Sequence, residues 1–156
     1  MNLISIDPGN NTGWAVFHVP APGTTARLLS AGVEKKADLF HPTSPRIPGG
    51  IILASATLVL IELPQHVKVP VMDLITLAVG VGEIKRFYEA QSCRVELVWP
   101  RTWKGTVPTP VHNKRVLAAL TPEELALLPR RPRAKDVDHN CVDAVGLGLW
   151  KLRRLR

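Results

Sequence analysis

The first 33 residues predict three strands in direct succession, and this pattern constrains the fold more than any other feature. Residues 2–6 form a short run rich in β-branched side chains, residues 8–11 (Pro-Gly-Asn-Asn) have the composition of a tight turn, and residues 12–19 resume the strand pattern. Residues 26–33 predict a third strand. Because short turns join strands that pair in antiparallel fashion, the segment predicts an antiparallel meander.

The rest of the chain predicts a mixture of strands and helices. Strands are expected over residues 57–62 and 94–99, and helices over residues 70–91, 112–120 and 138–154. The segment Thr121-Pro-Glu-Glu predicts one more helix, with threonine as the cap and proline in the first position. This order predicts an α/β fold, in which a mixed five-stranded sheet is flanked by helices.

The connecting segments and the long helix complete this prediction. Loops are expected over residues 34–50 and 100–110, one or two helical turns over residues 51–56, and a basic linker over residues 129–135. In the helix over residues 70–91, one face carries Val71, Ile75, Ala78, Val79, Gly82 and Phe87. Gly80 and Gly82 each cost on the order of 1 kcal/mol in a helix relative to Ala. We therefore expect close backbone approach there, to the sheet or to a second copy of the chain.

Length and composition fit a single domain over residues 1–156. The chain is 46% hydrophobic, which is enough apolar material for one core. No signal-peptide pattern precedes Asp7, and the longest apolar run, residues 51–61, is too short to cross a bilayer. Cys93 and Cys141 lie outside any zinc-binding spacing, so we expect both to be reduced packing residues. These features predict a cytoplasmic protein without a membrane partner.

Positive charge is concentrated in the last third of the chain. The net charge is +7, and residues 1–100 contribute nothing to it because eight Lys and Arg balance eight Asp and Glu. Residues 101–156 hold twelve basic and five acidic residues. One-sided positive charge is typical of a protein that binds phosphate backbones, although it also fits a solubilising surface.

Three carboxylates occur at the ends of apolar elements. Asp7 ends the first predicted strand, Glu62 ends the fourth, and Asp143 lies one turn into the last helix. Taken singly, Asp7 also fits a turn and Glu62 a surface acid, but acids at the ends of core elements usually share a cation or a partner. Oxygen-rich sites favour Mg²⁺ or Mn²⁺, and two such ions can hydrolyse a phosphodiester.

Four segments of the chain resemble the RuvC-type Holliday junction resolvases of the RNase H-like superfamily, and in particular their bacteriophage relatives. The matching segments are residues 4–16 (ISIDPGNNTGWAV), 58–62 (LVLIE), 98–105 (VWPRTWKG) and 139–150 (HNCVDAVGLGLW). The resemblance implies an RNase H-like fold and a location in the host cytoplasm if the protein is phage-encoded. It also implies a magnesium-dependent nuclease, with two ions per site and no small-molecule cofactor, that acts as a homodimer on four-way DNA junctions.

The resemblance also assigns roles to individual residues. By position, Asp7, Glu62 and Asp143 correspond to the family's metal ligands. The family's fourth ligand is commonly Asp or His, but here that position holds Asn140, which leaves the role to His139, Asp138 or Asp136, with the first two preferred. Asp138 also fits a simpler role, because an aspartate at this position often serves only as the N-cap of a helix.

Further residues are candidates for DNA contact. Lys104, in the Trp103-Lys104-Gly105 motif, leads a set that also includes Arg101, Lys114, Arg115, Arg130, Arg131 and Arg133. Bacterial members carry an aromatic wedge just after the glutamate, where this chain has Gln65 and His66. Opening of the junction must therefore depend on other residues, and the arginines at 130, 131 and 133 also fit a solvated linker.

Three other functions fit part of the pattern. The same acids would serve a nuclease that acts on RNA or RNA–DNA hybrid, which the sequence barely separates from a junction resolvase. A junction-binding protein without activity is disfavoured by the presence of all three acids. An actin-like nucleotide binder, suggested by Asp7-Pro8-Gly9, would require two such domains.

Overall fold

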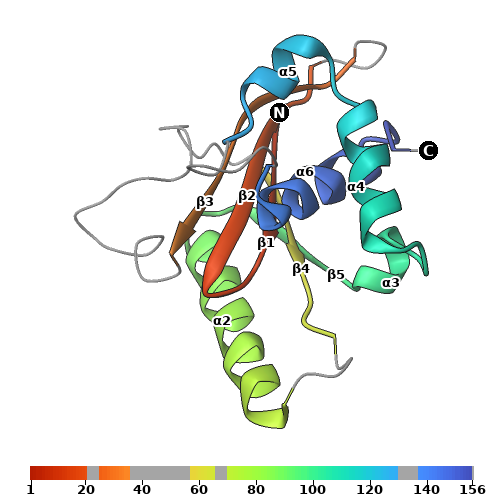
Figure 1. The fold of residues 1–156 in the computed structure, drawn as a ribbon. Helices are drawn as coiled ribbons and strands as arrows, with labels where there is room; N and C mark the ends of the chain where they lie inside the picture. Colours follow the sequence, from red (N-terminus) through yellow and green to blue (C-terminus); the bar gives the residue numbers. More distant parts are fainter. Residues whose placement is uncertain (21–24, 36–56, 66–69, 130–136, 156) are drawn as a thin grey trace.

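The computed structural model describes residues 1–20, 25–35, 57–65, 70–129 and 137–155. It contains a five-stranded sheet with the strand order β3-β2-β1-β4-β5 (Figure 1). The strands are β1 (Asn2–Asp7), β2 (Asn11–His18), β3 (Arg27–Lys35), β4 (Leu58–Glu62) and β5 (Arg94–Val98). β1, β2 and β3 pair in antiparallel fashion, whereas β4 runs parallel to both β1 and β5. The predicted meander and mixed sheet are confirmed.

Helices cover both faces of this sheet. α2 (Val71–Ala90) lies against one face, α6 (His139–Lys151) lies against the other, and α4 (Thr109–Ala118) packs on α6 (Figure 1). Two short helices, α3 (Pro100–Trp103) and α5 (Pro122–Ala126), connect the remaining elements. No helix within these described ranges is both long and apolar enough to span a membrane.

Each face of the sheet has its own hydrophobic core, because side chains alternate between the faces along every strand. Ile4 and Ile6 pack with Val81 and Ile84 on the α2 face. Leu3 and Leu60 pack with the buried side of α6 on the opposite face. Cys93 and Cys141 are buried free thiols, as predicted, and they lie on opposite faces of the sheet.

Local capping signals formed as the sequence predicted. Thr121 Oγ1 accepts from Glu124 N, and the Glu124 side chain accepts in turn from Thr121 N, so that α5 begins with a complete capping box. α6 begins at the Asp138 cap, whose side chain accepts from Asn140 N at 3.0 Å. α6 ends at Lys151, earlier than predicted, because Arg153 adopts a left-handed backbone conformation with φ 56°.

Two loop predictions were wrong where the chain is described. Residues 100–110 hold α3 and the start of α4 rather than a continuous loop, because Pro100 occupies the first turn of α3 and Pro110 that of α4. Glu34 and Lys35 extend β3, since they pair with Thr12 and Asn11. The helical turns expected over residues 51–56 lie outside the described residues, as do most of the loop over 34–50 and the linker over 129–135.

Candidate active site

Alternation along β1 and β4 places Asp7 and Glu62 on the same face of the sheet. Ser5, two residues before Asp7, donates from Oγ to Ala144 O of α6 at 2.6 Å, so this side of β1 faces α6. Leu58 and Leu60, which precede Glu62 at the same spacing, belong to the core on the α6 face. Because Ile6 pairs with Ile61 in parallel register, the two acids come one residue later at the same edge of the sheet.

α6 brings Asp143 to this edge through a close contact with β2. A Cβ atom on Gly13 would lie 2.0 Å from Asn140 O and 2.3 Å from Asn140 C, so only glycine allows the first turn of α6 to lie so close. Gly13 itself pairs with Asp7 across the β1–β2 ladder. The residue that admits the helix is therefore beside the first acid.

Lys104 links two of the acids. Its Nζ lies 3.2 Å from Glu62 Oε1 and 2.9 Å from Asp143 Oδ2. The same ammonium lies 4.7 Å from the ring centroid of Trp103, and Trp103 Nε1 donates to Glu62 Oε2 at 2.9 Å. The last residue of α3 and its C-cap thus supply an indole and an ammonium group to acids that come from β4 and α6.

Burial and repulsion between the acids raise the pKa of two of them, Asp7 and Glu62. Removal from water, followed by the charges of Glu62 and Asp143, raises the pKa of Asp7 well above its ordinary value. Burial also raises the pKa of Glu62, against the opposing charge of Lys104. Burial alone would lower the pKa of Lys104, but the charges of Glu62 and Asp143 outweigh it and raise that pKa. The three acids therefore share one electrostatic environment that favours additional positive charge.

His112 completes the surroundings of Asp143 and was missed by the sequence analysis. Its Nε2 lies 3.9 Å from Asp143 Oδ1, its ring packs edge-on against Trp103 at 5.0 Å, and the side chain is buried. Burial lowers its pKa despite the charge of Asp143. The only local signal is its place on a helix that follows the Trp103-Lys104 motif, which says nothing of the long-range contact.

The residues considered for a fourth ligand occupy the first turn of α6. Asp138 acts as the helix cap, and its charge contributes to the raised pKa of Asp7. His139 Nδ1 lies 3.8 Å from Asp138 Oδ1 on a side chain that is 60% exposed, while Asn140 is half-buried. Asp136 lies outside the described residues. Across the described segments, no three His, Cys, Asp or Glu side chains are grouped as ligands for one metal ion.

Two of the three acids, Asp7 and Glu62, open into a cleft of about 340 Å³ between the sheet edge and α2. Asp7, Glu62 and Lys104 line it, together with Leu77 and Val81 of α2. Gln65 also lines this cleft and is exposed, whereas His66 lies outside the described residues. The cleft therefore gives a solvent-side ligand access to the carboxylates.

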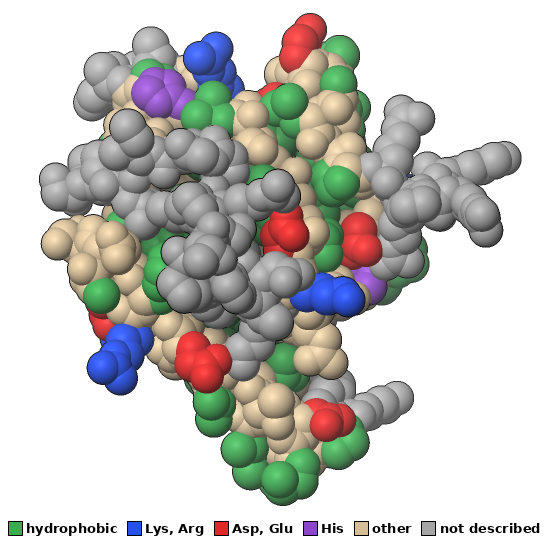
Figure 2. Space-filling view, turned by 90° about the vertical axis from the view of Figure 1, so that its left-hand side faces the viewer, with side chains coloured by type: hydrophobic (Ala, Val, Ile, Leu, Met, Phe, Trp, Pro, Cys, Tyr) green, Lys and Arg blue, Asp and Glu red, His purple; other side chains and the backbone are tan. Residues whose placement is uncertain are grey.

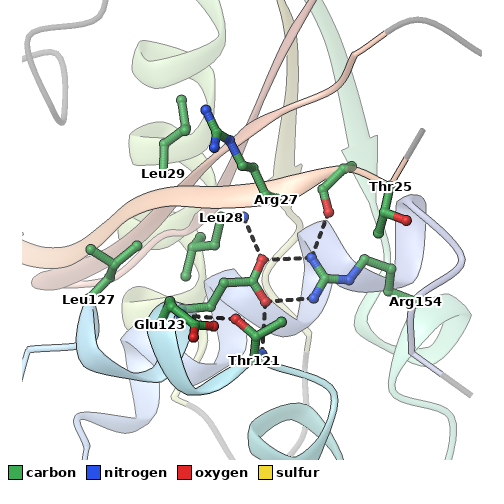
Figure 3. Close-up of a pocket in the computed structure, with 10 residues that line it drawn as sticks. Thr25, Arg27, Leu28, Leu29, Thr121, Glu123, Leu127 and Arg154 are labelled. Atoms are coloured by element: carbon green, nitrogen blue, oxygen red, sulfur yellow. Dashed lines mark hydrogen bonds and ion pairs between the residues drawn. The ribbon is translucent and has the colours of Figure 1, made fainter.

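A larger pocket of about 620 Å³ lies at the opposite end of the strands, between β3 and α5 (Figure 3). Two of its charged groups bind each other: Arg154 donates to both Glu124 oxygens, at 2.8 and 2.6 Å, and Leu28 N donates to Glu124 Oε1 at 2.7 Å. Arg154 also donates to Ala26 O at 2.8 Å. Because these contacts satisfy the polar groups internally, we attribute a structural role to this pocket.

The predicted DNA-binding residues fall into two groups. Arg101, Lys114 and Arg115 are exposed on α3 and α4, the two helices that follow β5. Arg130, Arg131 and Arg133 lie outside the described residues. Lys104 differs from the first group, since it is half-buried and contacts two acids.

The fold is similar to that of solved Holliday junction resolvases. The fowlpox virus Holliday junction resolvase is 16% identical over 99% of this chain and 100% of that chain, with a TM-score of 0.59. The complex of the fowlpox enzyme with substrate Holliday junction DNA gives 18% identity, 97% of each chain and a TM-score of 0.54. RuvC of Thermus thermophilus is 19% identical over 96% of this chain and 92% of that chain, with a TM-score of 0.52.

No protein-family model matches the sequence, and no curated protein matches it. At the identities found, the structural similarity establishes the fold alone. The predicted RNase H-like arrangement, a mixed five-stranded sheet flanked by helices, is confirmed.

Proposed function

We propose that this protein is a metal-dependent endonuclease that cleaves branched DNA, with the four-way junction as its substrate. The observation that carries the proposal is the convergence of Asp7, Glu62 and Asp143, from three different elements, around Lys104. The similarity of fold to resolvases, one of them in complex with Holliday junction DNA, supports the choice of substrate.

The donor set suits a hard divalent cation. Asp7, Glu62 and Asp143 offer carboxylate oxygens, which Mg²⁺ and Mn²⁺ prefer, and their mutual repulsion favours the binding of positive charge. When bound, such ions activate water and stabilise the negative charge that develops in phosphodiester hydrolysis. Glu62 is oriented for this role by its bond from Trp103 Nε1.

Basic residues beside the cleft would hold the DNA backbone. Lys104 is placed to donate to a phosphate oxygen near the acids, and Arg101, Lys114 and Arg115 are exposed on adjoining helices. Each phosphate that such a residue neutralises should steepen the log–log dependence of affinity on salt by roughly 0.9 on duplex DNA. Affinity therefore comes from groups other than the three acids.

The outward side of α2 supports a homodimer. Met72, Val71, Val79 and Ile75 are 70%, 61%, 55% and 50% exposed, although the residues of α2 that face the sheet are also apolar. Figure 2 shows hydrophobic side chains gathered at the lower end of the molecule. The N-terminal half of α2 lies at the same height in Figure 1. A Cβ on Gly82 would meet no atom within 4 Å, so a second helix could approach there. A two-fold dimer would present two active sites to a junction with matching symmetry.

A cleavage assay tests the function. Synthetic four-way junctions, linear duplex and RNA–DNA hybrid are each incubated with Mg²⁺, with Mn²⁺ and with a chelator. We expect the wild type to nick symmetrically related strands of the junction only when metal is present. Asp7→Asn, Glu62→Gln and Asp143→Asn should each lose roughly 100-fold or more in rate, since several kcal/mol of charge stabilisation disappear at about 1.4 kcal/mol per tenfold.

The control variant is Glu123→Gln, which changes an exposed carboxylate on α5 outside the acid cluster. It should cleave as the wild type does, and the three site variants should still bind the junction. Rates like the wild type in any one of the three site variants would refute the site. Preferential cleavage of the hybrid would instead support the RNA-directed alternative.

A further inference from the structure

His112 holds a buried nitrogen that has no hydrogen-bond partner. The residue is 4% exposed, and within the described segments no hydrogen bond reaches its Nε2 atom. A buried polar atom left unpaired lowers stability, and an apolar side chain of the same shape would avoid that cost. The presence of an imidazole at this position therefore requires an explanation other than packing.

Packing of α4 on α6 directs His112 toward Asp143. His112 and Val116 lie one turn apart on α4. Asp143 and Gly146 lie one turn apart on α6. A Cβ atom on Gly146 would lie 2.8 Å from Val116 Cγ2, so the two helices come close at that level. One turn earlier on both helices, His112 Nε2 faces Asp143 Oδ1 at 3.9 Å.

The ring of His112 is also fixed against Trp103. The two ring centroids are 5.0 Å apart and the planes are inclined at 71°, an edge-on arrangement that aromatic pairs favour. Trp103 is itself buried, and its Nε1 donates to Glu62 Oε2 at 2.9 Å. A ring held in this way can offer its nitrogen in one direction with little further loss of entropy.

Two of the acids use their oxygens in the same way. Glu62 Oε2 accepts from Trp103 Nε1, whereas Glu62 Oε1 lies 3.2 Å from Lys104 Nζ. Asp143 Oδ1 faces His112 Nε2, whereas Asp143 Oδ2 lies 2.9 Å from the same ammonium. One oxygen of each acid thus points to a buried ring nitrogen, and the other lies beside Lys104. Carboxylates that bind metal ions are commonly held by a hydrogen bond of this kind.

We propose that His112 is a positioning residue, which donates from Nε2 to Asp143 Oδ1 and thereby fixes the direction in which Oδ2 meets a divalent cation. This inference rests on the proposed function and deepens it. An N–H···O bond forms at about 2.9 Å, so the two atoms, now 3.9 Å apart, must approach by about 1 Å. Hydrogen bonds at active sites are often long in the free protein and shorten in the complex.

Calorimetric titration with Mn²⁺ in the absence of DNA tests the inference. His112→Phe keeps a ring against Trp103 but has no donor, so its Kd for Mn²⁺ should rise about 10- to 100-fold. Its Tm should equal or exceed that of the wild type, because no buried nitrogen is left unpaired. His112→Gln, whose amide nitrogen reaches the place of Nε2, should recover most of the affinity. The amide of His112→Asn is too short to do so.

The control is His18→Phe, the same substitution at the last residue of β2. His18 pairs with Asn2, at the end of β1 away from Asp7, so this variant should bind Mn²⁺ as the wild type does. In junction cleavage, His112→Phe should lower kcat and leave KM unchanged, because the histidine acts through Asp143 and not through the DNA.

Different outcomes separate the inference from the proposed function. Wild-type values of both Kd and kcat in His112→Phe would mean that the imidazole only packs, and the inference would be overturned. Equal affinities in His112→Gln and His112→Asn would also overturn it, and this comparison holds even if His112→Phe does not fold. If the wild type binds Mn²⁺ but cuts no junction, the choice of substrate is wrong and the metal affinities alone decide the role of His112. If the wild type binds no Mn²⁺, the proposed metal dependence is wrong, and the inference is overturned with it.

Discussion

Replacing Gly13 by Ala should damage the candidate site without touching an acid. The added Cβ would lie 2.0 Å from Asn140 O and 3.0 Å from Cys141 N, both atoms of the α6 backbone. Ordinary contacts between heavy atoms begin near about 3.5 Å. Because backbone atoms cannot rotate away as a side chain can, β2 and the first turn of α6 must separate by more than about 1 Å.

Two effects of Gly13→Ala can be estimated from this displacement. Overpacking of a close contact costs about 1–3 kcal/mol, and a domain of this size loses about 2–4 °C in Tm for each kcal/mol. Since Asp143 lies on the same helix as Asn140, its carboxylate moves relative to Asp7 and Glu62. A shift of about 1 Å in a catalytic group can cost about 100-fold in rate.

Thermal unfolding and junction cleavage measure these two effects separately. Glu123→Gln is the control, because it changes an exposed side chain on α5 outside the acid cluster. We expect Gly13→Ala to lower Tm and to cleave far more slowly at a temperature where it is still folded. If Gly13→Ala equals the wild type in both Tm and cleavage rate, the close β2–α6 contact does not position the site.

Two other predictions concern the far pocket and α2. Burial alone would raise the pKa of Glu124, but hydrogen bonds from Arg154, Leu28 and Thr121 outweigh it and lower that pKa from an ordinary 4.5 to about 2. Glu124→Gln should therefore lower the free energy of unfolding by about 3 kcal/mol at neutral pH. Since that pKa is depressed, the stabilisation is complete above pH 4.5 and disappears as the pH falls toward 2. Urea denaturation should therefore show the free energies of unfolding of wild type and variant becoming equal in acid. A difference that stays constant with pH would contradict this. Ile75→Lys combined with Val79→Glu should convert the proposed dimer to a monomer, as measured by light scattering. The free energy of unfolding of the monomer should change by less than about 1 kcal/mol, because both side chains are exposed. An unchanged molar mass would exclude this side of α2 as the dimer interface.

Local patterns in the sequence were enough to predict much of the molecule. Residues 2–6 and 57–62 were recognisable as strands from their β-branched and apolar side chains, so the sequence placed Asp7 and Glu62 at strand ends, as the structure confirms. The Thr121 and Asp138 caps were also predictable, because capping depends on residues within one helical turn.

Other features depended on contacts between distant segments. The sequence placed Lys104 among the DNA-binding residues, but only the folded chain shows its ammonium between Glu62 and Asp143. The place of His112 on a helix after the Trp103-Lys104 motif did not indicate that it is buried beside Asp143 and Trp103. The apolar side of α2 that carries Val71, Ile75 and Val79 was recognisable as one face, yet its outward direction became clear only once Val81 and Ile84 were seen against the sheet.

Periodicity, turns and caps are set by interactions within a few residues, and the sequence by itself therefore determined the strands, most of the helices and the position of Asp7 and Glu62 at the ends of their strands. The approach of Lys104, Trp103 and His112 to those acids was decided by the tertiary structure alone. The physical reason is that packing of α3, α4 and α6 on the sheet sets the distances between them, and those distances depend on the shapes of all the side chains in between.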